Sequence, residues 1–306
     1  MWRTLIVSSG EKLTVNSGWL HVCSPEREVR VPINDLYSVV IDNRRAMLSV
    51  AVLTTLAQAG VHILFCDEKH LPAAHLMPLN DHYQPLTVVR KQLELSEELK
   101  DLLWQRITQQ KILNQAQVLR LTGVGGEKAA HLESLAQQVQ PGDSTHKEAQ
   151  AARFYFRALF GPGFVRGGDD VTNAALNYGY TILRSALCKT LAGYGYNCLL
   201  GLHHINRANP FNLADDLMEP FRPLVDLWVD DHCEDLFEEL TRSNRNSLID
   251  LVNHTLRFED KRMRVRYVMD RTVKSLTSAI DGEDAGMLLL PSILRHDPLF
   301  EDEQDG

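Results

Sequence analysis

Residues 201–223, GLHHINRANPFNLADDLMEPFRP, guide the interpretation of the whole chain. They hold two histidines, three carboxylates and three prolines within 23 residues, between two segments of helical periodicity. Asp215 and Asp216 lie four and three residues before Glu219, so either pair would share one helix face. Like charges on one face repel each other, which a bound cation or a solvated surface would relieve. Pro220 follows Glu219 directly and removes a backbone donor, so the acids lie at a predicted kink, which favours a functional site.

The composition is that of an ordinary globular protein of one large domain or two smaller ones. Hydrophobic residues make up 44% and charged residues 24% of the 306 positions. No apolar run is long enough to span a bilayer, and the start, MWRTLIVSSG, lacks a basic region followed by an apolar core. The five cysteines form no CxxC pair, which favours reduced thiols over a disulfide framework or a zinc site. We therefore expect a cytoplasmic protein without signal peptide or membrane span.

The charge is unevenly distributed. The net charge of −8 by itself argues against a nucleic-acid partner. Residues 242–274, however, hold nine Lys or Arg against four acids, whereas residues 226–239 hold seven acids and no base. This segregation permits a basic groove on an acidic protein, although solvated helix faces would explain it equally well.

The first part of the chain is predicted to be rich in β-strands. LTVNSGWLHV and EVRVPINDLYSVVID contain alternating or β-branched runs, interrupted by turn signals at residues 16–18 and 24–25. MLSVAVLTTLAQAG predicts a helix that stops at Gly60, and VHILFC predicts a strand. LPAAHLMPLNDHYQP, with three prolines, is typical of a connection out of the domain.

From Val88 onward the pattern is helical. Leucines recur at helical spacing up to the glycines at 123–126, and KEAQAARFYFRALFG and DVTNAALNYGYTILRSALCKTLAGYG predict two further helices. The predicted class is α+β: a β-rich domain over residues 1–78, a linker over 79–87, an all-α domain over 88–296 and an acidic tail over 297–306.

The candidate site residues also have plain structural explanations. Thr145 and Glu148 have the spacing of a capping box, which would start a helix near Thr145. His203 and His204 are adjacent, so at most one of them would face a given site. Asp215, Asp216 and Glu219 could form a solvated helix face.

A family resemblance separates these alternatives. VPINDLYSVVIDN, AQAGVHILFCDEKHLPAAHLMPLNDHY, KEAQAARFYFRALFG, NAALNYGYTILRS and residues 201–223 resemble the CRISPR-associated spacer-acquisition integrase, in the form found with type II systems. The resemblance runs through nearly the whole chain. Its most specific part is residues 201–223, where the His, Asp-Leu-Met-Glu and Pro-Phe-Arg-Pro motifs stand in order and at the family's spacing.

The resemblance implies a metal site. The family's ligands fall on Glu148, His204 and Glu219, with Asp216 as a supporting acid and His203 as a packing residue. Two carboxylates and one imidazole suit Mg²⁺ or Mn²⁺ better than zinc. No organic cofactor is expected. If Glu148 binds metal, the helix cap would have to come from Thr145 alone.

The resemblance also implies an activity and its partners. The expected enzyme is a DNA endonuclease and integrase that inserts short foreign DNA into a CRISPR repeat by 3′-hydroxyl attack, for antiviral and anti-plasmid defence. The implied partners are double-stranded DNA, a second copy of the chain paired through the N-terminal domain, and a small ferredoxin-like adaptation protein that completes a hetero-hexamer. The alternatives are a non-catalytic DNA-binding scaffold of the same fold and, with less support, a metal phosphohydrolase with paired His and Asp residues.

Candidate phosphate contacts come from basic residues in or near these motifs. Each of them could pair with nearby acids instead. The candidates are Arg153, Arg157, Arg222, Lys261, Arg262, Arg264 and Arg266.

Overall fold

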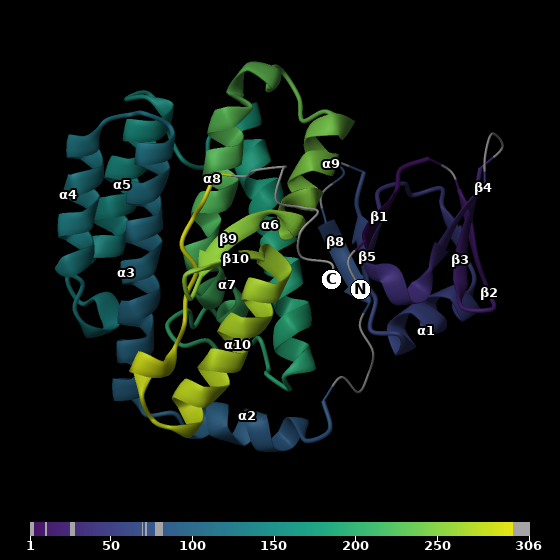
Figure 1. The fold of residues 1–306 in the computed structure, drawn as a ribbon, viewed down its shortest axis with the longest axis horizontal. Helices are drawn as coiled ribbons and strands as arrows, with labels where there is room; N and C mark the ends of the chain where they lie inside the picture. The colour runs from purple at the N-terminus through teal and green to yellow at the C-terminus, as the bar shows by residue number, and fades with distance from the viewer. Residues whose placement is uncertain are drawn as a thin grey trace. The chain divides into compact units, whose positions relative to one another are not determined.

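The computed structural model describes residues 3–9, 11–24, 28–68, 70, 72–76 and 82–295. It contains two compact units, Met1–Tyr83 and Gln84–Gly306, the first rich in strands and the second mostly helical (Figure 1). The class is therefore α+β, as predicted. Residues 79–81 of the predicted linker and the whole predicted acidic tail lie outside the described residues.

The described residues of the N-terminal unit form two sheets and one α-helix. One sheet has the order β1-β5-β7-β8, with β8 antiparallel to β7 and the other pairs parallel. The other has the order β4-β3-β2-β6. The elements are β1 (Arg3–Val7), β2 (Lys12–Asn16), β3 (Trp19–Cys23), β4 (Glu28–Pro32), β5 (Leu36–Ile41), β6 (Met47–Leu48), α1 (Val50–Gln58), β7 (His62–Cys66) and β8 (Pro72–Leu76).

The turn predicted at residues 16–18 joins β2 and β3. Asn16 pairs with Trp19, which leaves a two-residue loop of Ser17 and Gly18 with φ of 49° and 80°. Positive φ at both central positions is typical of the turn whose twist matches that of a β-hairpin. The turn signal in the sequence therefore located this hairpin correctly.

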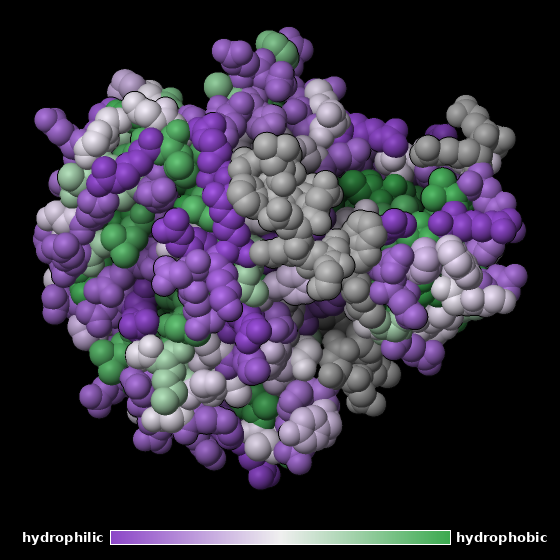
Figure 2. Space-filling model, viewed as in Figure 1, coloured by the Kyte–Doolittle hydropathy of each residue, from purple (hydrophilic) through white to green (hydrophobic). Residues whose placement is uncertain are grey.

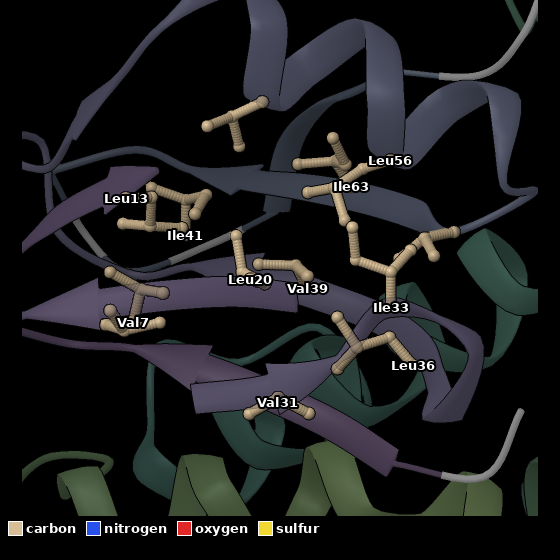
Figure 3. Packing of buried hydrophobic residues seen from close by; sticks show 13 residues of the cluster. Val7, Leu13, Leu20, Val31, Ile33, Leu36, Val39, Ile41, Leu56 and Ile63 are labelled. Atoms are coloured by element: carbon tan, nitrogen blue, oxygen red, sulfur yellow. The ribbon is translucent and has the colours of Figure 1, made fainter. Parts of the chain in front are cut away.

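Both sheets and the helix share one apolar core. Leu13, Leu20, Val39, Ile63 and Leu56 come from β2, β3, β5, β7 and α1, and they lie in a single buried cluster (Figure 3). Burying each such side chain stabilises the fold by about 1.5–3 kcal/mol relative to exposing it. The alternating apolar pattern of the strands is thus explained by one shared core.

Two details of the N-terminal predictions are wrong. The predicted helix over MLSVAVLTTLAQAG begins only at Val50, because Ser49 caps it by accepting from the Val52 N–H at 3.3 Å, and Met47–Leu48 forms β6. Part of the predicted exit connection, Pro72–Leu76, is strand β8, paired with β7. Pro72 is the first residue of that strand, at the edge of the sheet, where a proline is tolerated.

The second unit is a helical domain with one small β-hairpin. Its helices are α2 (Pro85–Glu94), α3 (Glu97–Leu121), α4 (Gly126–Gln137), α5 (Lys147–Phe160), α6 (Val171–Gly193), α7 (Asn212–Met218), α8 (Arg222–Asp231), α9 (Arg242–Asp250) and α10 (Val265–Asp281). Strands β9 (Thr255–Phe258) and β10 (Lys261–Arg264) pair antiparallel, so the prediction of an all-α domain is wrong at this hairpin.

The long helix α3 organises this unit. It contacts α4, α5 and α8, and α3, α4 and α5 stand side by side in Figure 1. Its buried residues include the apolar Leu103 and Ile107 but also the polar Lys111, Asn114 and Gln115. Buried polar groups need partners. Lys111 pairs with Glu148 and Glu219, and Asn114 donates to the carbonyls of Pro220 and Pro291. Within the part of the chain that the structure describes, no helix is long and apolar enough to cross a membrane.

Candidate metal-binding and DNA-processing site

The kink predicted at Pro220 is a break between helices α7 and α8. Helix α7 ends at Met218, Glu219–Phe221 form a 3-10 turn, and α8 begins at Arg222. The carbonyl of Pro220 accepts a hydrogen bond of 2.7 Å from Asn114 Nδ2 of α3. Because Asn114 is only 1% exposed, this bond attaches the turn to the buried side of α3.

Asp216 orders the loop that carries the two histidines. Its carboxylate is fully buried, and it accepts backbone N–H bonds from Leu202 at 2.6 Å and from His203 and His204 at 3.1 Å each. A Cβ at Gly201 would lie 2.3 Å from the His204 carbonyl oxygen and 2.9 Å from Asp216 Oδ2. The loop therefore closes this tightly only with glycine at 201.

Asp216 also holds the ring of His204. Nδ1 of His204 lies 2.6 Å from Asp216 Oδ1. An ionised carboxylate can only accept, so Nδ1 carries the proton and Nε2 is the nitrogen that faces away from Asp216. The hydrogen bond with Asp216 raises the pKa of His204, although burial opposes it. Asp216 thus fixes the orientation of the His204 ring and leaves Nε2 as the nitrogen that could bind a metal ion.

His203 has a different environment. Its ring stacks on the indole of Trp104 in α3, with centroids 4.3 Å apart and planes 1° apart. The ring of His204 meets the same indole edge-on at 5.6 Å. Both rings therefore contact the same indole, and the His204 ring is also hydrogen-bonded to Asp216.

Lys111 brings the two predicted carboxylate ligands together. Its ammonium, on α3, forms ion pairs with Glu148 of α5 and with Glu219. Arg222 lies on the other side of Glu219, with Nε 3.1 Å from Oε1. Glu219 and Lys111 are nearly buried, whereas the Glu148 side chain is 30% exposed. Two carboxylates and two cations thus form one compact cluster.

The pKa values of the cluster follow from this pairing. Burial by itself would raise the pKa of Glu219, but Arg222 and Lys111 overcome that effect and lower it. Burial would likewise lower the pKa of Lys111, but Glu219 and Glu148 raise it. Glu219 and Lys111 are therefore both charged at neutral pH.

Helix α5 is not capped as predicted. Its N-cap is His146, with φ 53° and ψ 42° and no capping side chain. Asp143 caps it instead, because its carboxylate accepts from the N–H of Lys147 at 2.8 Å and of Glu148 at 3.0 Å. The predicted capping box of Thr145 and Glu148 is wrong, as is the expectation that Thr145 alone would cap. The Glu148 side chain is thereby free to reach Lys111.

The donor set fits a hard divalent cation. Glu219 Oε2 is buried and contacts the Lys111 ammonium as an ion pair, without a hydrogen bond of good geometry. His204 is close enough to Glu219 for each to shift the pKa of the other. Among the described residues, however, no three His, Cys, Asp or Glu side chains already enclose a metal position. The ligand set Glu148, His204 and Glu219 remains a prediction.

Sequence reasoning missed Lys111 and Asn114. A lysine and an asparagine in the middle of a helix ordinarily indicate a solvated face. Their one distinguishing signal is that they follow Ile107 at helical spacing, on the side of α3 that carries its buried leucines.

The predicted phosphate contacts fall in three different environments. Arg153 and Arg157, with Lys128, line a cavity of about 580 Å³ between α4 and α5. None of these three is ion-paired with any residue that the structure describes. Arg157 lies nine residues after Glu148, about 2.5 helical turns, so the cavity is on the opposite face of α5 from Lys111.

Of the other basic candidates, one is ion-paired, one is buried and the others are exposed or half-buried. Arg222 pairs with Glu219 and lies over the Tyr180 ring at 4.9 Å. Lys261 and Arg262 on β10 are exposed, and Arg264 is half-buried. Arg266 is 4% exposed and donates to Asn253, so its guanidinium does not belong to the exposed basic surface.

Comparison with known proteins places the chain in a family. A family model described as "CRISPR associated protein Cas1" matches residues 4–235. A CRISPR-associated endonuclease Cas1 of Neisseria meningitidis serogroup C is 39% identical over 295 residues, which cover 96% of this chain and 97% of the relative.

Solved structures share the fold. A casposase bound to an integration product matches with a TM-score of 0.75 and 17% identity, over 92% of this chain and 91% of that chain. A chain of a Cas6-RT-Cas1–Cas2 complex matches with a TM-score of 0.73 and 18% identity, over 96% of this chain and 36% of that chain. At such identities these two likenesses show the fold alone.

Proposed function

Because this chain belongs to the CRISPR-associated Cas1 family, we propose that it is a divalent-metal-dependent DNA endonuclease and integrase of CRISPR adaptation. One observation carries the proposal. Glu148 of α5 and Glu219 of the turn between α7 and α8 both pair with the Lys111 ammonium. The ring of His204, oriented by Asp216, belongs to the same site. Paired carboxylates with an imidazole are a ligand set for Mg²⁺ or Mn²⁺.

The proposed reaction is a transesterification. The 3′-hydroxyl of a short captured duplex attacks a phosphodiester at an end of the CRISPR repeat. A bond forms between that 3′ oxygen and phosphorus, and the bond from phosphorus to the neighbouring 3′ oxygen breaks. The proton of the attacking hydroxyl ends on the leaving oxygen. With water as the attacker, the same site cleaves DNA.

Each side chain has a distinct part in this proposal. Glu148, His204 and Glu219 would hold the ion, which supplies Lewis acidity toward the phosphodiester. Asp216 fixes the tautomer and orientation of His204. Arg222 holds one oxygen of Glu219. In phosphoryl transfer the protein acts mainly by positioning and by charge stabilisation, and these fixed contacts provide the positioning.

DNA binding is proposed for the basic cavity between α4 and α5. Lys128, Arg153 and Arg157 converge on it, and the lining includes the aromatic ring of Phe154 but no carboxylate. Unpaired cations beside an aromatic ring suit a phosphate backbone with adjacent bases. The exposed Lys261 and Arg262 on β10 are proposed as further phosphate contacts. The face of the helical unit seen in Figure 2 is mostly hydrophilic, with smaller hydrophobic patches between the polar side chains.

The proposed assembly is a homodimer joined by a small ferredoxin-like adaptation protein into a hetero-hexamer, acting in the prokaryotic cytoplasm. The N-terminal unit is proposed to carry the homodimer contact. In its support, Trp19, Met47 and Val50 of that unit are exposed large apolar side chains. A chain in a complex titled Cas6-RT-Cas1–Cas2 has the same fold.

The test is the joining of a labelled short duplex to a supercoiled plasmid that carries a repeat, with Mn²⁺ and with a chelator. We expect metal-dependent joined product from the native chain and none from Glu148→Gln, His204→Ala or Glu219→Gln. Glutamine is chosen at 148 and 219 because it keeps the shape of the buried cluster. Tight duplex binding without product from the native chain would favour the non-catalytic scaffold. Full activity of one variant would remove that residue from the ligand set.

A further inference from the structure

Lys111 occupies the point where the two proposed carboxylate ligands meet. It is 6% exposed and lies in the middle of α3, and its ammonium is paired with both Glu148 and Glu219. The oxygens it contacts are Glu148 Oε1 and Glu219 Oε2. The other oxygen of Glu219, Oε1, faces Arg222. Both oxygens of the buried carboxylate are therefore already used by cations that belong to the chain itself.

The charges of this cluster cancel. Glu148 and Glu219 contribute two negative charges, and Lys111 and Arg222 contribute two positive charges. A divalent cation bound by the same carboxylates would add two positive charges a few ångströms from a buried ammonium. Like charges at such distances repel strongly where solvent is scarce, so the ion and the ammonium compete for the same oxygens.

We propose that Lys111 is an internal cation that competes with the divalent metal for Glu148 and Glu219, and that metal binding requires its ammonium to leave these carboxylates. The proposal rests on the metal site of the proposed function. Its physical basis is that a carboxylate pair brought together by folding is destabilising unless a cation compensates it. Lys111 supplies that compensation in the metal-free protein, and it thereby weakens the metal affinity of the same pair.

The long, unbranched side chain of lysine suits this role. It carries a point charge on a flexible four-carbon stem, so the ammonium can move by rotation about side-chain bonds while α3 stays in place. Asn114, one turn further along α3, keeps the turn at Pro220 attached to the helix. Release of Lys111 therefore need not displace Glu219 itself.

The experiment measures Mn²⁺ binding to the full-length protein without DNA, by isothermal titration calorimetry and by paramagnetic resonance of free Mn²⁺. Lys111→Met keeps the length and removes the charge. We expect it to bind Mn²⁺ at least about tenfold more tightly than the native chain, which corresponds to a difference of about 1.4 kcal/mol. Lys111→Arg retains the charge, and its affinity should stay close to the native value. Lys100→Met is the matched control, because Lys100 lies on the same helix and pairs with Glu97 at 2.7 Å rather than with a proposed ligand. Its affinity should equal the native value.

Thermal unfolding provides a second measurement. In a chelator, Lys111→Met should melt at a lower temperature than the native chain, and saturating Mn²⁺ should raise its melting temperature by more than it raises that of the native chain. If Lys111→Met does not fold without metal, Lys111→Gln, which can still donate hydrogen bonds to both carboxylates, is measured instead with the same expectation.

Unchanged or weaker Mn²⁺ binding in the folded charge-removing variant would overturn the proposal and leave the metal site itself intact. Loss of Mn²⁺ binding in Glu148→Gln or Glu219→Gln identifies the site measured as the proposed one. If the native chain and Lys111→Met both fail to bind Mn²⁺, the metal site fails, and the proposal on Lys111 fails with it.

Discussion

The carboxylate of Asp216 holds His204 twice, through its backbone N–H at 3.1 Å and through its ring Nδ1 at 2.6 Å. The backbone N–H groups of Leu202 and His203 donate hydrogen bonds to the same carboxylate. One buried acid thus sets both the path of the loop and the direction of the imidazole that it carries.

Replacing Asp216 with asparagine should disturb both functions. The carboxylate accepts with both oxygens, whereas an amide has only one acceptor oxygen, and its NH₂ group would point at backbone N–H groups. Some of these buried N–H groups would lose their acceptor. We expect a loss of about 2–4 kcal/mol in the free energy of unfolding. The pKa of His204 should fall, because the hydrogen bond that raises it is lost. Urea unfolding and an NMR titration of the histidine ring measure the two effects.

The neighbouring Asp215→Asn provides the comparison. Asp215 accepts from Asn209 at 2.7 Å, whereas the N–H groups of Leu202, His203 and His204 all donate to Asp216. Its substitution should change both quantities much less. Equal effects of the two substitutions would contradict the role assigned to Asp216.

Gly201→Ala should impair the site by steric conflict. The new Cβ would lie 2.3 Å from a backbone oxygen, which cannot move aside as a flexible side chain could. We expect a loss of about 1–3 kcal/mol in stability and a larger relative loss of strand joining, because the histidine loop must shift. Gly193→Ala, at the end of α6, adds a Cβ that meets nothing beyond its own helix within 4 Å, so it should lower neither quantity. Native-like joining by Gly201→Ala would show that the loop tolerates the shift.

The basic cavity between α4 and α5 should appear in the salt dependence of DNA binding. Each phosphate contact contributes about 0.9 to the slope of log K against log salt concentration for duplex DNA. The double variant Arg153→Ala and Arg157→Ala should bind duplex more weakly and reduce that slope by about 1–2. Arg120→Ala, which removes an arginine paired with Glu133 at 2.7 Å, is the control and should keep the slope. An unchanged slope in the double variant would exclude the cavity as a phosphate site.

Asp226 should produce a pH-dependent stability. Burial raises the pKa of its carboxyl to about 6, and the Tyr180 hydroxyl donates to it. In the unfolded chain this pKa is about 3.9, so the folded state retains a proton that the unfolded state releases. This contribution to stability is fully present below about pH 4 and is lost as the pH rises through about 6.

Asp226→Asn cannot titrate. Relative to the native chain, its free energy of unfolding should therefore increase by about 3 kcal/mol between pH 4 and pH 7. Urea unfolding at several pH values measures the difference. Parallel curves for the two proteins would mean that the buried carboxyl does not have a raised pKa.

Much of the fold follows from local patterns. Alternating residues predicted the strands β2 and β3, and the signal at residues 16–18 predicted their turn, because hairpin geometry depends on a few adjacent residues. The helices α5 and α6 also follow the predicted segments closely, because amphipathic periodicity is a local property. Strand β8 and the β9–β10 hairpin were missed, because pairing with other strands, rather than their own composition, makes them strands.

The sequence alone determined the chemical character of the site. It provided an acid at a proline kink, a histidine at the family's spacing and a second acid in a separate helix, and the resemblance assigned these to one metal site. The N-cap of α5 could not be obtained in this way, because Asp143 reaches Lys147 and Glu148 across a turn with left-handed residues that the spacing rule does not include.

Only the tertiary structure decided how the charges are balanced. Lys111 lies 37 residues before Glu148 and 108 before Glu219, so no periodicity relates it to either carboxylate. Packing of α3 against α5 and the turn at Glu219 brings the three together, and burial makes the pairing obligatory, because a desolvated carboxylate needs a cation. The residue types in the sequence therefore determined which ions the site could attract, and the fold decided which cation of the chain itself lies there in the metal-free protein.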